Sequence, residues 1–188
     1  MNAAVSVIEI FADVRCPFTH VGLRRLVERR EASGAHFVLK VRAWPLELVN
    51  DAPLDASLIA AEVAELRRQV APDLFTGFDP DAFPASSLPA LGLAAAAYER
   101  DRHLGETVSL RLRDALFEQG RDIGERGELA HIADRLGLPR DLADPASVLR
   151  DWHEGQTRGV IGSPHFFIGG DSYFCPTLHI EHHHGHLR

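Results

Sequence analysis

Apolar and polar positions alternate between strand-like and helical patterns in the N-terminal part of the chain. Residues 5–11 form an apolar run typical of a buried β-strand, and residues 37–44 form a second one that ends at Pro45. Between them, residues 17–33 carry apolar side chains at helical spacing, and Gly34 is a plausible C-terminal stop. Strand, helix and strand of these lengths predict a right-handed unit with two parallel strands.

The middle of the chain, from about residue 55 to 158, is helical in pattern throughout. Apolar residues recur every three or four positions, and proline or glycine separates the segments. A loop rich in turn-forming residues covers 77–84. The pattern predicts helices at about 55–70, 86–103, 108–120, 129–136 and 145–152.

Strand character returns towards the C-terminal end. His165–Ile168 and Ser172–Cys175 are short runs on either side of Gly169-Gly170-Asp171, and this pattern predicts a β-hairpin. The sheet is thus expected to draw its strands from both ends of the chain.

The candidate chemistry lies at Cys16, where the first strand gives way to the helix. Pro17 suits the first helical position, so Cys16 falls at the N-cap, next to unpaired backbone N–H groups and the positive end of the helix dipole. Cysteines in such places can have a pKa between about 3.5 and 7.5 instead of about 8.5. We therefore expect an exposed, readily ionised nucleophile; the alternative is a buried cysteine that packs as a small apolar side chain.

Two motifs carry a resemblance to a known family. Asp13-Val14-Arg15-Cys16-Pro17-Phe18-Thr19 and Gly159-Val160-Ile161-Gly162-Ser163-Pro164-His165-Phe166-Phe167 resemble the DsbA-like branch of the thioredoxin superfamily. That branch also holds 2-hydroxychromene-2-carboxylate isomerases and kappa-class glutathione transferases. The resemblance implies an α/β, thioredoxin-like fold, a mixed sheet with flanking helices. It would be one domain over 1–188, split as 1–50 and 159–188 around a helical insertion at about 55–158.

The first motif departs from the redox members of that branch at Thr19. Those relatives carry C-x-x-C, in which the second cysteine resolves the mixed disulfide, so the usual active-site disulfide cannot form here. Thr19 follows Cys16 by three residues, close enough on a helix for its hydroxyl to donate to the sulfur. The glutathione-using relatives commonly carry serine at the position of Cys16.

Pro164 is the second candidate, because the resemblance implies a cis-proline that faces the thiol. A cis bond there would turn the backbone of Gly162 and Ser163 outward, towards an extended peptide or glutathione. The alternative is a turn proline that begins a strand. The residues expected to contact substrate are Pro17, Phe18, Gly162, Ser163, Pro164 and His165.

Three further side chains are candidates for accessory roles. His20 follows Cys16 by four residues on the same helical face, where it can stabilise a thiolate or donate a proton; a solvated helix histidine is the alternative. Asp13 is expected either to tune the thiol or to cap the loop. Cys175 is expected near the level of Pro164, where it either resolves a mixed disulfide or packs against its neighbours.

Composition limits the classes of function. The 188 residues suffice for one domain, and 45% hydrophobic with 25% charged residues is ordinary for a globular protein. A net charge of −7 argues against nucleic acid or an anionic membrane as partner. No signal peptide is visible, and two cysteines without an export signal are expected to be free thiols, which indicates the cytoplasm.

The histidines of the C-terminal tail are a weaker candidate. Clusters of this kind can bind metal, but at chain ends they are more often disordered, so we expect no metal site and no bound cofactor. The tail histidines are His179, His182, His183, His184 and His186.

These observations lead to three hypotheses about function. The first is a cytoplasmic thiol-disulfide oxidoreductase in which Cys16, assisted by Thr19 and His20, is the redox nucleophile on a protein or small-molecule substrate. Glutathione or another low-molecular-weight thiol such as mycothiol would resolve the mixed disulfide as co-substrate. The second is a glutathione-dependent transferase or isomerase, and the third is a non-catalytic binding module. A homodimer is compatible with each of them.

Overall fold

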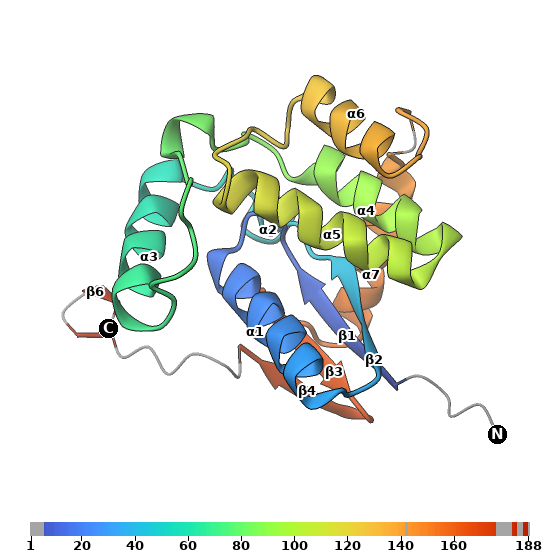
Figure 1. Ribbon diagram of the computed structural model, residues 1–188, viewed down its shortest axis with the longest axis horizontal. Helices are drawn as coiled ribbons and strands as arrows, with labels where there is room; N and C mark the ends of the chain where they lie inside the picture. The colour runs from blue at the N-terminus through green and yellow to red at the C-terminus, as the bar shows by residue number, and fades with distance from the viewer. Residues whose placement is uncertain (1–5, 142, 176–181, 184–185, 188) are drawn as a thin grey trace.

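The computed structural model describes residues 6–141, 143–175, 182–183 and 186–187. Its elements alternate strand and helix at the start, continue as helices, and end as strands (Figure 1). The strands are β1 Ser6–Ala12, β2 Phe37–Ala43, β3 His165–Ile168, β4 Asp171–Phe174, β5 His182–His183 and β6 His186–Leu187. The helices are α1 Pro17–Ser33, α2 Leu46–Val49, α3 Ala56–Gln69, the 3₁₀ turn η1 Pro80–Ala82, α4 Leu88–Arg100, α5 Arg102–Phe117, α6 Arg126–Arg135 and α7 Pro145–Thr157.

The main sheet has the strand order β2-β1-β3-β4. β1 and β2 are parallel, with Ile10 opposite Val41, and α1 connects them as the sequence predicts. β3 runs antiparallel to β1, with Phe166 opposite Ile10, and the hairpin to β4 is confirmed. The C-terminal end of β1 therefore lies beside the N-terminal end of β3, where both predicted motifs meet.

Helices cover both faces of this sheet (Figure 1). One face, which includes Ile10 and Leu39, packs against Leu23 of α1 and against Tyr98 and Leu110 of α4 and α5. On the other face, a smaller cluster joins apolar side chains of the sheet to α7. That cluster contains Phe11, Trp44, Leu46, Trp152, Val160 and Phe167. Alternate side chains of β1 pack into the two cores on opposite faces of the sheet. The end of β1, and with it the loop that follows, is therefore held by packing on both faces of the sheet.

The helices between β2 and β3 build the largest apolar core of the described residues. Val14, Val21 and Ala43, which adjoin the sheet, belong to the same cluster. α4, α5 and α7 also contact β2. The segment predicted as a helical insertion is thus packed continuously onto the strands that carry the candidate site.

The break between α4 and α5 differs most clearly from the sequence prediction. The helix expected to run to about residue 103 stops at Arg100, and α5 begins at Arg102. The side chain of Asp101 accepts hydrogen bonds from the amides of His103 and Leu104, which makes it the N-cap of a new helix. The short helix α2 was not predicted. Of the tail histidines, His179 and His184 lie outside the described residues.

Candidate functional site

Cys16 occupies the predicted N-cap of α1, with Pro17 in the first turn. Its backbone amide bonds to the carbonyl of Asp13 at 3.3 Å, and its carbonyl accepts from the amide of His20 at 3.2 Å. The Sγ donates to the carbonyl oxygen of Ser163 at 3.2 Å, although 147 residues separate the two. The sulfur of the first motif therefore lies directly against the second motif.

The expectation of an exposed thiol with a lowered pKa is wrong for this conformation. The Cys16 side chain is only 4% exposed, because the loop before β3 lies over it. Burial raises the pKa of the thiol above its ordinary value near 9.0; hydrogen bonds from Thr19 and Ser163 oppose the rise, and the charge of Asp13 adds to it. Desolvation thus outweighs the helix N-terminus, and the closed site holds the protonated form.

This electrostatic balance predicts how alkylation of Cys16 depends on pH. Because the pKa is raised, the thiolate fraction should grow about tenfold for each pH unit through the neutral range, without a plateau below pH 9. The rate of alkylation by iodoacetamide as a function of pH tests this prediction. It is measured on the Cys175→Ser variant, in which Cys16 is the remaining thiol. A plateau reached between pH 6 and 7 would show that the helix terminus dominates instead.

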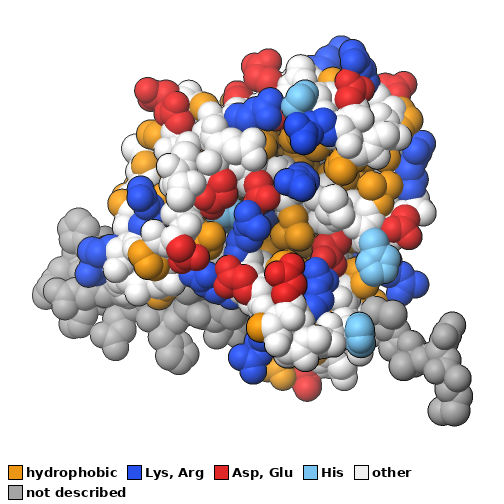
Figure 2. Space-filling view, in the orientation of Figure 1, with side chains coloured by type: hydrophobic (Ala, Val, Ile, Leu, Met, Phe, Trp, Pro, Cys, Tyr) orange, Lys and Arg blue, Asp and Glu red, His pale blue; other side chains and the backbone are white. Residues whose placement is uncertain are grey.

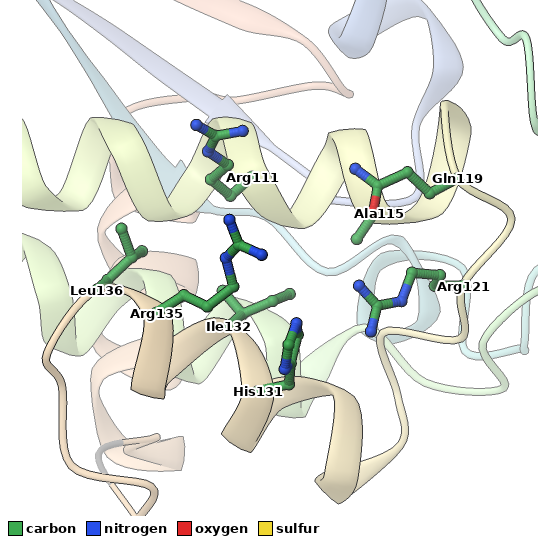
Figure 3. Close-up of a pocket in the computed structure, with 8 residues that line it drawn as sticks. All are labelled: Arg111, Ala115, Gln119, Arg121, His131, Ile132, Arg135 and Leu136. Carbon is green, nitrogen blue, oxygen red and sulfur yellow. The ribbon is translucent and has the colours of Figure 1, made fainter.

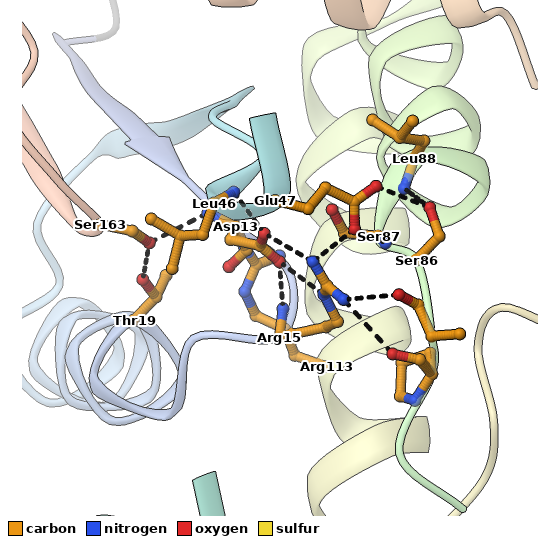
Figure 4. Close-up of polar contacts among 12 residues, drawn as sticks. Asp13, Arg15, Thr19, Leu46, Glu47, Ser86, Ser87, Leu88, Arg113 and Ser163 are labelled. Carbon is orange, nitrogen blue, oxygen red and sulfur yellow. Dashed lines mark hydrogen bonds and ion pairs between the residues drawn. The ribbon is translucent and has the colours of Figure 1, made fainter. Parts of the chain in front are cut away.

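The loop that covers Cys16 is fixed to both β1 and α1. The Ser163–Pro164 peptide bond is cis. Ser163 Oγ accepts from the amide of Asp13 at 3.0 Å and pairs with Thr19 Oγ1 at 3.1 Å (Figure 4). With Asp13 as its donor, Ser163 Oγ can donate to Thr19, which leaves the Thr19 hydroxyl proton free for the Cys16 sulfur. Thr19 therefore lies where the sequence predicts it.

Asp13 organises the turn beneath the thiol. Its carboxylate accepts from the backbone amides of Arg15 and Leu46, both at 2.8 Å, and from the Arg15 guanidinium at 3.4 Å (Figure 4). Arg15 is fully buried and also bonds to Glu47 at 2.6 Å. Both roles expected for Asp13 have support: its carboxylate caps the loop through these donors, and its charge adds to the rise in the pKa of Cys16.

Arg113 of α5 brings a second buried cation to this region. Its guanidinium donates to the backbone and side-chain oxygens of Ser109, at 3.0 and 2.8 Å, and to the carbonyl of Asp13 at 3.3 Å. Burial lowers its pKa to about 10, while nearby groups including Asp13 and Cys16 oppose that shift. A thiolate formed at Cys16 would thus have a positive charge close by.

His20 does not serve Cys16 as predicted. The ring is 1% exposed, packs between Phe75 and Phe117, and its Nε2 bonds to Glu118 Oε1 at 2.7 Å. Burial lowers the pKa of His20, so the ring is neutral and donates from Nε2. Burial alone would raise the pKa of Glu118, but His20 and the amides of Phe75 and Thr76 hold it at about 2. The pair joins α1 to α5, and the solvated alternative is excluded.

His165 and Cys175 adjoin Pro164. His165 is buried, stacks on Phe167 at 5.0 Å between ring centroids, and accepts from the amide of Ile161 through Nδ1. His165 and the neighbouring Phe166 are both buried, as helices cover both faces of the sheet. The amide of Cys175 bonds to the carbonyl of Pro164 at 3.0 Å, at the predicted level.

The residues expected to contact substrate are not equally accessible. Pro17, Gly162 and Pro164 are buried, and Phe18 packs into the core of the helical block. The exposed apolar surface beside the loop comes instead from Ile161, which is 69% exposed, and Phe174, which is 50% exposed. A Cβ at Gly162 would come within 2.4 Å of the Phe174 ring, so glycine permits this packing.

Sequence reasoning missed Arg15, Arg113 and Glu118. Arg15 stands two residues after Asp13, a spacing that suits a local ion pair at the end of a strand. Arg113 could have been found, because it falls four residues after Ser109 on the stripe of α5 that buries Leu112 and Leu116. Nothing in the sequence links Glu118 to His20, 98 positions away.

The chain belongs to the family of DSBA-like thioredoxin domains, whose model matches residues 7–187. Among curated proteins, no sequence matches the chain closely enough to count as a relative. The resemblance that the two motifs suggest is therefore confirmed at the level of the family.

Solved structures show the same fold at low sequence identity. A 2-hydroxychromene-2-carboxylate isomerase superposes with a TM-score of 0.67 at 16% identity, covering 89% of this chain and 88% of that one. A probable DsbA oxidoreductase from Streptomyces coelicolor superposes with a TM-score of 0.66 at 22% identity, covering 89% of this chain and 82% of that one. The cytosolic disulfide reductase DsbM from Pseudomonas aeruginosa, solved with GSH, superposes with a TM-score of 0.62 at 20% identity, covering 89% of this chain and 88% of that one. Within the described residues, no helix is long and apolar enough to cross a bilayer.

Proposed function

We propose that this protein is a thiol-disulfide oxidoreductase in which Cys16 is the redox nucleophile. The observation that carries the proposal is the position of its sulfur: at the N-cap of α1, bonded to the carbonyl of Ser163 beside cis-Pro164. The sulfur has a hydroxyl donor in Thr19 and a cation in Arg113 nearby. Both stabilise a thiolate once the loop opens and water reaches the site.

The exchange begins when the hydrogen bond from Cys16 to Ser163 breaks and the thiol proton passes to solvent. The Cys16 thiolate attacks one sulfur of a disulfide, the S–S bond breaks, and the other sulfur leaves as a thiolate. A mixed disulfide remains on Cys16. The freed carbonyl of Ser163 then offers an acceptor to an extended substrate beside the sulfur.

A second thiol must resolve that mixed disulfide, because Thr19 stands in place of the second motif cysteine. We propose glutathione or another low-molecular-weight thiol as this co-substrate; the structural neighbour DsbM was solved with GSH. A reducing compartment such as the cytoplasm suits a protein whose two cysteines are both free.

The test is disulfide exchange on a small aromatic disulfide, assayed with and without glutathione. A stoichiometric burst without glutathione and sustained turnover with it support the proposal. No release of the aromatic thiol under either condition overturns it.

Cys175 is the alternative resolving thiol, since the chain contains no other cysteine besides Cys16. Burial raises its pKa to about 11, and the charge of Cys16 adds to the rise, so little of it is thiolate at neutral pH. We therefore expect Cys175→Ser to keep the glutathione-dependent turnover within about twofold. If the variant instead accumulates the mixed disulfide on Cys16, as shown by peptide mass mapping, Cys175 resolves it.

A transferase or isomerase that uses a thiol cofactor is the second candidate. Two features favour it: Cys16 is buried with a raised pKa, and position 19 carries threonine. A reaction in which the thiol of glutathione is the nucleophile requires neither a thiolate at Cys16 nor a second motif cysteine. In that reaction Cys16 would position the thiol of glutathione without exchanging with it.

A further inference from the structure

We propose that a cavity between α5 and α6 is a binding site for a small polyanion, such as phosphate or pyrophosphate. The cavity has a volume of about 220 Å³. We call it the arginine cavity, and its lining includes Arg111, Arg121, His131 and Arg135. It does not include Cys16 or the Pro164 loop, so this inference is independent of the proposed function.

Basic side chains enter the arginine cavity from two helices and a loop. Arg135 and His131 rise from α6 towards α5, Arg121 reaches in from the segment after α5, and Arg111 lies along α5 (Figure 3). The amide of Gln119 also faces this space, above the apolar side chain of Ala115. The lining thus combines donors from several directions with a small apolar surface, as in sites that orient a charged ligand.

The positive charge of the cavity is only partly compensated within the described residues. Arg121 is ion-paired with Glu128 at 2.5 Å. Asp114, which interacts electrostatically with Arg111, is already paired with Arg24 at 2.7 Å. Burial raises the pKa of Asp114, and the charges of Arg24, His20 and Arg111 oppose that rise. Arg135 and Arg111 have no carboxylate oxygen within 4.0 Å among the described residues, although many other arginines of this chain do. An anion bound between them would offset their mutual repulsion.

This arrangement is local, because the protein as a whole carries a net charge of −7. On the face that contains α5 and α1, acidic and basic side chains are mixed over the surface (Figure 2). A cavity that concentrates guanidinium groups on such a protein selects for a compact ligand that fits inside, rather than for an extended polyanion.

Size and chemistry narrow the ligand class. A volume of about 220 Å³ exceeds the roughly 30 Å³ of one water and falls below the usual pocket range of about 300–1,000 Å³. Guanidinium groups match phosphate oxygens in pairs of parallel hydrogen bonds. A ligand with one or two phosphoryl groups is small enough for this volume and offers the oxygens that guanidinium groups bind.

The test is isothermal titration of the full chain with inorganic pyrophosphate at low salt. We expect binding to the wild type, an affinity at least about tenfold lower for Arg111→Gln/Arg135→Gln, and a smaller loss for each single variant. Arg67→Gln, an exposed arginine of α3, is the matched control and should bind as the wild type does. Parallel titrations with inorganic phosphate and with AMP distinguish a free phosphate from a nucleotide as the source.

Two results would overturn this inference. One is an absence of binding to the wild type at millimolar pyrophosphate; the other is equal affinity of the wild type and the double variant. Because these substitutions lie on the surface, the melting temperature without ligand should stay within a few degrees of the wild-type value. Cys16 exchange should persist in the double variant, which separates this site from the proposed catalytic function.

Discussion

Replacing Cys16 by serine is expected to reduce disulfide exchange to the uncatalysed rate. The hydroxyl of serine cannot form a mixed disulfide, and the other thiol, Cys175, is little ionised at neutral pH because burial raises its pKa to about 11. The change is nearly isosteric and keeps a donor to the Ser163 carbonyl, so the fold and the loop should persist. The initial rate of exchange on a small aromatic disulfide, in the presence of glutathione, measures the loss.

The same variant separates the two candidate functions. If Cys16→Ser abolishes exchange and also any conjugation or isomerisation, the sulfur itself reacts. Retention of conjugation or isomerisation by the serine variant would favour the role in which residue 16 only positions a thiol cofactor. Cys175→Ser, which removes the other free thiol of the chain, is the control for nonspecific effects of losing a cysteine.

The largest expected effect on stability comes from Asp13→Ala. The substitution removes the carboxylate that pairs with the fully buried guanidinium of Arg15 and leaves the amide of Leu46 without its acceptor. Arg15 keeps Glu47 as a partner, so the cost of its lost pairing lies below the about 3–5 kcal/mol of a buried charge left alone. The buried amides of Arg15 and Leu46 also lose their acceptor, at about 1–3 kcal/mol each, and together these losses amount to about 3–5 kcal/mol. We expect a fall of that size in the free energy of unfolding, measured by urea denaturation.

Asp73→Ala provides the matched control. Asp73 also pairs with an arginine, Arg25, at 2.6 Å, but its side chain is 54% exposed. Exposed pairs contribute about 0–1 kcal/mol, since water solvates both partners when the pair breaks. Equal losses for Asp13→Ala and Asp73→Ala would mean that the network below Cys16 is not the structural support described here.

Much of the fold can be read from local patterns in the sequence. The buried runs of β1 and β2, the helix from Pro17 to Ser33 and the Gly34 stop are all found where periodicity and end signals predict them. The N-cap at Asp144 and the hairpin of β3 and β4 follow in the same way. These features depend on residues that are near one another in the chain.

The state of Cys16 could not be read in this way. The helix N-terminus is a local signal, and it correctly places the residue. The loop that covers the thiol contains Ser163, which is far from Cys16 in the sequence. The desolvation that raises the pKa of Cys16 therefore depends on tertiary packing. His20 was likewise misassigned because its partner, Glu118, comes from the end of α5. His20 does follow Cys16 by four residues on α1, but its ring nitrogen bonds to Glu118 instead of the sulfur.

Mass mapping of the protein after brief exposure to oxidised glutathione tests most directly whether Cys16 is the reacting thiol. We expect a glutathione adduct on the peptide that contains Cys16, loss of this adduct on addition of reduced glutathione, and no such adduct in Cys16→Ser. An adduct confined to Cys175, or a Cys16 that stays unmodified while exchange proceeds, would contradict the assignment of Cys16 as the reacting thiol.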